Sequence, residues 1–291
     1  MRCGICTTDV KPASADVIFR KIKGWGFECV QFSFVSVIES NFIEDGRIEI
    51  PWSVSPAAID AIIRASEKYG LPIEAVNGTY NMAHPDKNVR DEGAARFVGF
   101  AEATKALGAK YITLCSGSRN RENLWGYSPE NNTADAWRDM ADSMKRVVDI
   151  AEKLDMTLAI ESEAANVIST PEKARQIMDE IGSPRLKMII DFANLFHAGE
   201  AYRENVRPTI KHAIDVFGHD IVIAHGKDIK EGDGIEFTGT GEGIVDFAYC
   251  AKLLNDIGYG GDMFLHGIYD EDKMISARDH WLNAEKEALS I

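Results

Sequence analysis

Four short apolar runs in the second half of the sequence are each followed by a residue that can bind a divalent cation. Glu161 follows the run 158–160, Asp191 follows 188–190, His225 follows 222–224 and His266 follows 263–265. Taken singly, an Asp or His after a strand is commonly a cap or turn residue. An acid after a buried run, however, needs a partner. Two carboxylates with two imidazoles suit Mn²⁺, Zn²⁺, Fe²⁺ or Co²⁺, whereas Mg²⁺ prefers oxygen ligands alone.

These four residues can share one ion only if the strands before them are neighbours. Along the chain an amphipathic helix repeatedly ends in a glycine or short turn, and a short apolar run comes next. A glycine tolerates the left-handed conformation that ends a helix, and short apolar runs are typical of strands buried on both faces. The predicted strands are residues 2–6, 27–30, 71–76, 110–114, 156–160, 186–190, 221–224 and 263–265.

Eight alternations of strand and helix without a break in composition favour one closed (β/α)8 barrel over residues 1–291. The length suits such a barrel, and the hydrophobic content of 45% is enough to fill it. Ser55-Pro56 and Thr170-Pro171 mark helix starts, each with a capping hydroxyl before a proline. A doubly wound open sheet is the structural alternative.

In a barrel, consecutive strands lie about 4.8 Å apart, so the four candidate ligands converge at the carboxyl ends of the strands. The segments after the second, fourth and seventh predicted strands are long, at residues 33–54, 116–133 and 226–243. Barrel enzymes build their active sites from the loops at this end. We therefore expect the site there.

The composition of the chain limits the kinds of molecule that it is expected to bind. The formal net charge is −14, with acidic residues spread along the chain, which argues against a nucleic-acid partner because such binding needs clustered Lys and Arg. Of the five cysteines, Cys3 and Cys6 are separated by two residues, but no second pair completes a zinc site. We expect buried thiols, a reducing compartment, and a cytoplasmic protein without a membrane partner.

Several motifs carry a resemblance to a known family. They are Gly78-Thr79-Tyr80-Asn81-Met82-Ala83-His84-Pro85-Asp86, Leu158-Ala159-Ile160-Glu161, Asp191-Phe192-Ala193-Asn194-Leu195-Phe196, His225-Gly226-Lys227-Asp228 and Gly239-Thr240-Gly241-Glu242-Gly243-Ile244-Val245-Asp246-Phe247. With them the sequence resembles the xylose isomerase-like TIM-barrel superfamily of sugar and sugar-phosphate isomerases and epimerases. In its ketose 3-epimerases a Glu, an Asp, a His and a final Glu hold one metal, which implies Glu161, Asp191, His225 and position 266 as ligands.

The chain departs from that pattern at position 266, where His stands in place of the second glutamate. The resemblance implies a keto-sugar, sugar phosphate or related polyol as substrate, and proton abstraction next to a metal-bound carbonyl. Glu161 is the expected base. A metal-bound His is a poor base, so a second acid or base is needed, and Glu163 is the candidate because it lies two residues further on.

Other polar residues are candidates for substrate binding. By resemblance Lys227 and Asp228 line the site, and Lys227 would neutralise a substrate oxygen or phosphate; a surface ion pair is the alternative. Asn194 would bind a hydroxyl or cap a helix. The remaining candidates are Asn81 and His84 after the third strand and Arg119, which would clamp an anion.

Three other functions are alternatives. A lyase or dehydratase acting on a keto-sugar or inosose-like ring would begin with the same proton abstraction. A non-catalytic sugar-binding barrel would keep the fold and lose the chemistry. Endonuclease IV shares the barrel, but here Asn194 stands where its second histidine follows the aspartate, and no Asp-x-His precedes Gly241. The resemblance also allows a homo-oligomer, since such barrels often pair through their mouths.

Overall fold

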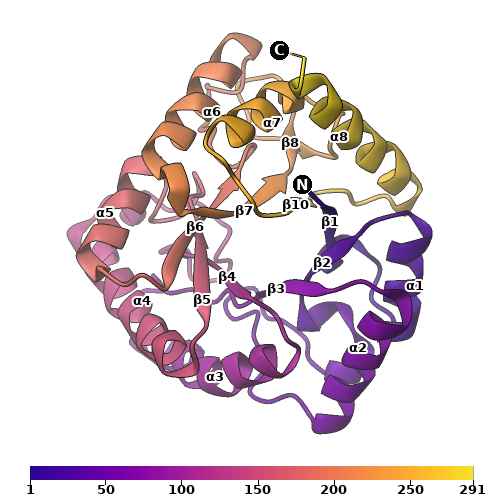
Figure 1. Ribbon diagram of the computed structural model, residues 1–291. Coiled ribbons are helices and arrows are strands. Elements are labelled where there is room, and N and C mark those ends of the chain that lie inside the picture. The colour runs from indigo at the N-terminus through magenta and orange to yellow at the C-terminus, as the bar shows by residue number, and fades with distance from the viewer. Residues whose placement is uncertain (291) are drawn as a thin grey trace.

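A computed structural model describes residues 1–290 and shows a closed barrel of eight parallel strands (Figure 1). Around the barrel the strand order is β1-β10-β7-β6-β5-β4-β3-β2. The strands are β1 (Cys3–Cys6), β2 (Cys29–Phe32), β3 (Ile73–Asn77), β4 (Tyr111–Cys115), β5 (Thr157–Glu161), β6 (Leu186–Asp191), β7 (Ile221–Gly226) and β10 (Met263–Leu265). Pairing of Cys3 with Met263 closes the ring. The predicted (β/α)8 barrel is therefore confirmed, and the open-sheet alternative is wrong.

The helices form a ring outside the strands, as Figure 1 shows. They are α1 (Ala15–Gly24), α2 (Pro56–Tyr69), α3 (Lys87–Ala106), α4 (Ala134–Leu154), α5 (Pro171–Ile181), α6 (Arg203–Phe217), α7 (Phe247–Asp256) and α8 (Met274–Ala288). Ser55 and Thr170 cap α2 and α5 as expected, each accepting a hydrogen bond from a backbone amide of the first helical turn. These caps fix where each loop at the carboxyl end of a strand must end.

Two local features differ from the sequence prediction. Strands β2 and β3 each begin two residues later than expected, and the parallel register of β2 with β1 starts at the pair Gly4 and Cys29. The segment after β7 also contains a small antiparallel hairpin, β8 (Asp228–Ile229) with β9 (Phe237–Thr238). Strands of two residues carry too little periodicity to be seen in the sequence.

The apolar core lies in two places. The larger part packs between the strands and the helices. A smaller cluster takes one residue from each of seven strands and fills the barrel interior: Cys6, Cys29, Ala75, Ala159, Ile189, Ile223 and Phe264. Gly4 makes room for this filling, since a Cβ there would lie 2.6 Å from the ring of Phe264. The expected burial of all five thiols is confirmed, and none is in a disulfide.

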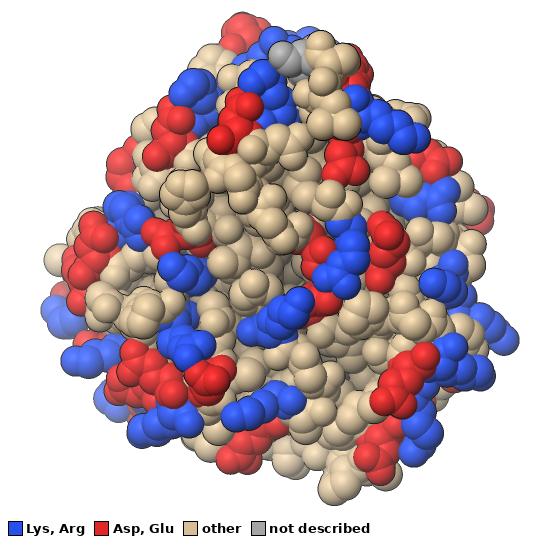
Figure 2. Space-filling view, viewed as in Figure 1, with Lys and Arg blue, Asp and Glu red and all other residues tan. Residues whose placement is uncertain are grey.

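The surface carries charges of both signs. On the face that Figure 2 shows, acidic and basic side chains are interspersed around the rim. Within residues 1–290 no helix combines the length and the apolar character that crossing a bilayer requires.

Candidate metal centre and substrate cavity

Three of the four predicted ligands meet at the carboxyl ends of neighbouring strands. Glu161 ends β5, Asp191 ends β6, and His225 lies in β7 directly opposite Asp191 in the register. One ligand atom of each lies within 4.8 Å of the others, and all three residues are buried. The Nδ1 of His225 is 3.2 Å from Glu161 Oε2 and 3.6 Å from Asp191 Oδ2. The barrel thus gathers an O, O, N donor set around one point.

In each of these residues the other polar atom is already committed to the protein. Asp191 Oδ1 accepts hydrogen bonds from the backbone amides of Ala193 and Asn194, and Glu161 Oε1 accepts one from the side chain of Asn194. His225 Nε2 lies 2.9 Å from Oε1 of Gln31 on β2. Because that oxygen can only accept, the single proton of the neutral ring belongs on Nε2, and the lone pair of Nδ1 then faces the cluster.

Two of the three atoms that face the common point lack a hydrogen-bond partner. Among residues 1–290, neither Asp191 Oδ2 nor His225 Nδ1 has a hydrogen-bond partner. Buried polar atoms are almost always satisfied, and leaving them unpaired is costly. Two oxygens and one imidazole nitrogen, each oriented by an outer hydrogen bond, fit a divalent transition metal ion.

The electrostatics also favour a cation at this point. Burial alone would lower the pKa of His225, but the adjacent carboxylates of Asp191 and Glu161 outweigh it and raise the pKa to about 9. Burial likewise opposes ionisation of Asp191, yet His225 and Lys227 hold the pKa of that carboxyl below its usual value. In the metal-free protein an imidazolium therefore supplies the positive charge that the carboxylates require.

Three further predicted residues line the same cavity: Glu163, Asn194 and Lys227. Lys227 Nζ donates to Asn194 Oδ1 at 2.9 Å and lies 3.6 Å from the centre of the Phe237 ring. Asn194 in turn donates to Glu161, so Lys227, Asn194 and Glu161 form one chain of hydrogen bonds. Burial, with the charge of Glu161, raises the pKa of Glu163 to about 8.

His266 lies outside the group of three. It follows β10, and its ring centre is 6.0 Å from that of His225. Its Nδ1 is 3.1 Å from Oδ1 of the buried Asp9, a contact that no sequence motif indicated. The side chain lines the cavity and is about 31% exposed. Its role as a fourth ligand stays a prediction.

The structure places four other candidates outside the cavity wall. Asp228 accepts hydrogen bonds from four backbone amides, those of Ile229, Gly241, Gly243 and Val245. The two side-chain oxygens are thereby used to shape the loop after β7. The carboxylate of Asp228 is therefore engaged by its own backbone, and its substrate contact stays a prediction.

Asn81, His84 and Arg119 also have polar atoms that are engaged within the protein, and their role in substrate binding stays a prediction. Asn81 accepts a hydrogen bond from the amide of Ser118, and His84 contacts the carbonyl of Arg121. Arg119 forms a buried ion pair of 2.8 Å with Asp139.

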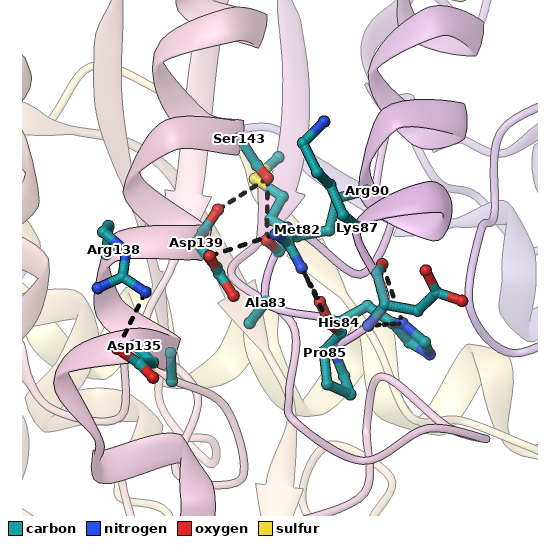
Figure 3. Close-up of polar contacts among 12 residues, drawn as sticks. Met82, Ala83, His84, Pro85, Lys87, Arg90, Asp135, Arg138, Asp139 and Ser143 are labelled. Carbon is teal, nitrogen blue, oxygen red and sulfur yellow. Dashed lines mark hydrogen bonds and ion pairs between the residues drawn. The ribbon is translucent and has the colours of Figure 1, made fainter.

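Figure 3 shows the framework that fixes the loop after β3 to α3 and α4. Arg90 of α3 donates to the carbonyl of His84, and its ion pair with Asp139 is 3.2 Å. Ser143 of α4 donates to the carbonyl of Met82 at 3.0 Å. These contacts hold the loop between the two helices.

The cavity above the cluster has a volume of about 910 Å³. Its wall includes Gln31 and Glu49, which no sequence motif indicated. Glu49 lies in the long segment between β2 and α2, where Asn77 Nδ2 donates to it at 2.9 Å and Trp125 Nε1 at 2.8 Å. Burial, with the nearby Glu44, raises the pKa of Glu49 to about 7. Only the folded chain brings this acid to the site.

The fold and the cluster define a (β/α)8 barrel with a candidate metal centre at its carboxyl end. The sequence matches the family described as xylose isomerase-like TIM barrel over residues 19–288, and the chain belongs to that family. L-ribulose-5-phosphate 3-epimerase UlaE of Escherichia coli is 24% identical over 270 residues, covering 90% of this chain and 86% of that protein. The protein of that name from Shigella boydii is 26% identical over 276 residues, with coverage of 91% and 87%.

Solved structures share the fold. A D-tagatose 3-epimerase-like protein superposes with a TM-score of 0.75 at 18% identity, covering 100% of this chain and 99% of that one. The apo 3-keto-D-glucoside 4-epimerase YcjR of Escherichia coli has a TM-score of 0.71 at 18% identity, with coverage of 98% and 99%. The IolI protein, solved with a zinc atom, has a TM-score of 0.71 at 16% identity, with coverage of 100% and 98%.

Proposed function

We propose that this protein is a divalent-metal-dependent isomerase or epimerase acting on a keto-sugar, a sugar phosphate or a related polyol. One observation carries the proposal: Glu161, Asp191 and His225 direct ligand atoms at one buried point, and two of those atoms have no other partner. Relatives named as sugar epimerases support the reaction class, and the IolI protein with its zinc atom supports the metal. The partner is a small molecule held in the cavity.

The roles of the residues follow from their contacts. A divalent ion held by Glu161, Asp191 and His225 would stabilise negative charge developing on a carbonyl oxygen. Asn194 orients one oxygen of Glu161, so the other, Oε2, is placed to accept the proton from the carbon beside the carbonyl. Lys227 offers a buried positive charge beside Asn194. Glu163 lines the same cavity and is the second acid or base.

The relatives leave the nature of the substrate open. One is named for a sugar phosphate and another for a keto-glucoside. Elimination shares the first step with epimerisation, so a lyase acting on a keto-sugar or inosose-like ring remains the second candidate, favoured by the single observation that His266 replaces a carboxylate. Mass analysis separates the two, since an isomer conserves mass and elimination loses water or an aglycone.

The test compares Glu161→Gln with Asp191→Ala and His225→Ala. Purified proteins are analysed for bound metal and then screened with keto-sugars for deuterium exchange from solvent. We expect Glu161→Gln to keep much of the metal and to lose about 10²- to 10⁴-fold in exchange rate. We expect the other two variants to lose the metal as well. Arg119→Lys, which alters a residue outside the cavity, is the control. Normal exchange in Glu161→Gln would rule out the role of this carboxylate.

A further inference from the structure

The charge on the cavity wall limits the kind of substrate that can bind. This inference rests on the proposed function. Within residues 1–290 the wall contains four glutamates: Glu44, Glu49, Glu161 and Glu163. The same wall holds Lys227 but no arginine and no second lysine. Lys227 already donates to Asn194 and lies close to the carboxylates of the metal centre. A phosphate dianion is normally recognised by several cationic or amide donors, and this wall does not supply them.

Backbone amides in the loop after the seventh barrel strand are also already engaged. Barrel enzymes frequently bind phosphate with backbone amides after the seventh and eighth strands. Here the amides of Gly241, Gly243 and Val245 donate to the carboxylate of Asp228 at 3.0, 2.9 and 3.0 Å. These three amides are therefore not available to a phosphate group.

Glu49 gives the cavity an acceptor suited to hydroxyl groups. Its backbone amide donates to the carbonyl of Thr79 at 3.0 Å, and its two carboxylate oxygens are held by Asn77 and Trp125. Each oxygen has two lone pairs, so each keeps one for a sugar hydroxyl. The side chain is rigidly placed, because the three partners come from β3 and from the loops after β3 and β4.

Beside Glu49 the wall is apolar. The segment after β2 contributes Val35, Val37, Ile38, Phe42 and Ile43 to the cavity. Ile38 and Ile43 are 65% and 91% exposed, so the folded chain leaves them uncovered. A cavity of about 910 Å³ also lies near the upper end of the range of about 300–1,000 Å³ found for drug-sized ligands. One sugar ring fills only part of it.

We propose that the substrate is an unphosphorylated glycoside of a keto-sugar. Its sugar ring lies between the three-residue metal centre and Glu49, and its apolar group lies against the wall formed by residues 35–43. The substrate is therefore uncharged, and Glu49 and the wall formed by residues 35–43 determine the specificity for it.

Binding by calorimetry tests this without turnover. The metal-loaded protein at pH 8, where Glu49 is ionised, is titrated with alkyl β-D-glucosides from methyl to octyl and with glucose 6-phosphate. We expect affinity to rise about two- to fourfold for each added methylene over the first several carbons. We expect the phosphate ester to bind at least tenfold more weakly than the methyl glucoside.

Three variants locate the effect. In Ile43→Ser and Phe42→Ser the affinity should rise less with each added methylene than in wild type. Ile43 is exposed, so Ile43→Ser still provides the test if Phe42→Ser fails to fold. Glu49→Gln should weaken binding of the methyl glucoside and narrow the discrimination against the phosphate ester. Val98→Ser, at a 45% exposed position on α3, is the matched control and should behave as wild type.

Tighter binding of glucose 6-phosphate than of methyl glucoside would overturn the proposal, and so would an alkyl series that is flat in the wild type. A flat series together with a dimer that Ile43→Ser dissociates in sedimentation would assign the apolar wall to a second copy of the chain instead. The outcome is separable from the proposed reaction. Normal exchange in Glu161→Gln refutes the chemistry while leaving the binding series intact, and a flat series leaves the chemistry intact.

Discussion

Replacing Gln31 tests whether the metal centre is organised by its outer contacts. In Gln31→Leu the amide oxygen that lies 2.9 Å from His225 Nε2 is lost, although the two residues are 194 positions apart in the sequence. The ring then has no acceptor for its Nε2 proton. When the imidazolium loses one proton to bind a metal ion, the remaining proton is no longer held on Nε2 and can lie on Nδ1, the atom that faces Glu161 and Asp191. A metal ion would have to displace it.

Two independent quantities limit how much the loss of this acceptor weakens metal binding. A buried donor left without an acceptor costs about 1–3 kcal/mol. Removing the outer partner of a metal-binding histidine typically weakens metal affinity about 10- to 100-fold, equivalent to about 1.4–2.7 kcal/mol. The two ranges agree, so we expect Gln31→Leu to bind Zn²⁺ or Mn²⁺ about 10- to 100-fold more weakly than wild type.

The assay is competition with a chromophoric chelator at about pH 7.5, within the range where imidazole protonation competes with metal, with circular dichroism as the check on folding. Gln31→Glu is the matched control, because a carboxylate still accepts the proton of Nε2 and should keep affinity at or above the wild-type value. Equal metal affinity in wild type and a folded Gln31→Leu would refute the view that Gln31 sets the tautomer of His225.

Three other residues give predictions from single contacts. The pKa of His225, about 9 in the metal-free protein, means that one proton leaves as an ion binds, so apparent metal affinity should fall about tenfold per pH unit below 9. Calorimetry in buffers of different ionisation enthalpy measures this proton release, and the absence of any release would contradict the raised pKa of His225. The metal-free protein gains stability from charged His225 below pH 6.5, and this is lost as the pH rises through about 9. The pKa of Glu49, about 7 against a usual 4.5, means that its neutral form favours the fold and that this contribution is lost as the pH rises through 7. Between about pH 5 and 8 the free energy of unfolding of wild type should therefore fall by up to about 3 kcal/mol more than that of Glu49→Gln, as measured by urea unfolding. If the unfolding free energies of the two proteins changed equally with pH, the raised pKa would be contradicted. Arg119→Ala should cost about 1–3 kcal/mol of unfolding free energy, because Asp139 loses its ion pair with Arg119 and keeps only the one with Arg90. KM should be unchanged, and a tenfold rise in KM would return Arg119 to the substrate site.

The sequence alone predicted the barrel and the three residues that meet at the candidate metal centre. The same pattern recurs along the whole chain: a glycine or short turn ends each helix, and a buried apolar run follows. This repetition identifies every strand from local sequence. Glu161, Asp191 and His225 follow three consecutive runs, so the barrel order brings them together without further information. Local pattern is sufficient here because neighbours in sequence are neighbours in the barrel.

The rest depended on which way each side chain points and on contacts between distant segments. Gln31 reaches His225 across the barrel mouth, and Glu49 enters the cavity from a loop held by Asn77 and Trp125. Asp228, the last residue of a family motif, turns to backbone amides of its own loop. No spacing in the sequence encodes these choices, because each is settled by the hydrogen-bond partners and burial that exist only once the barrel has closed.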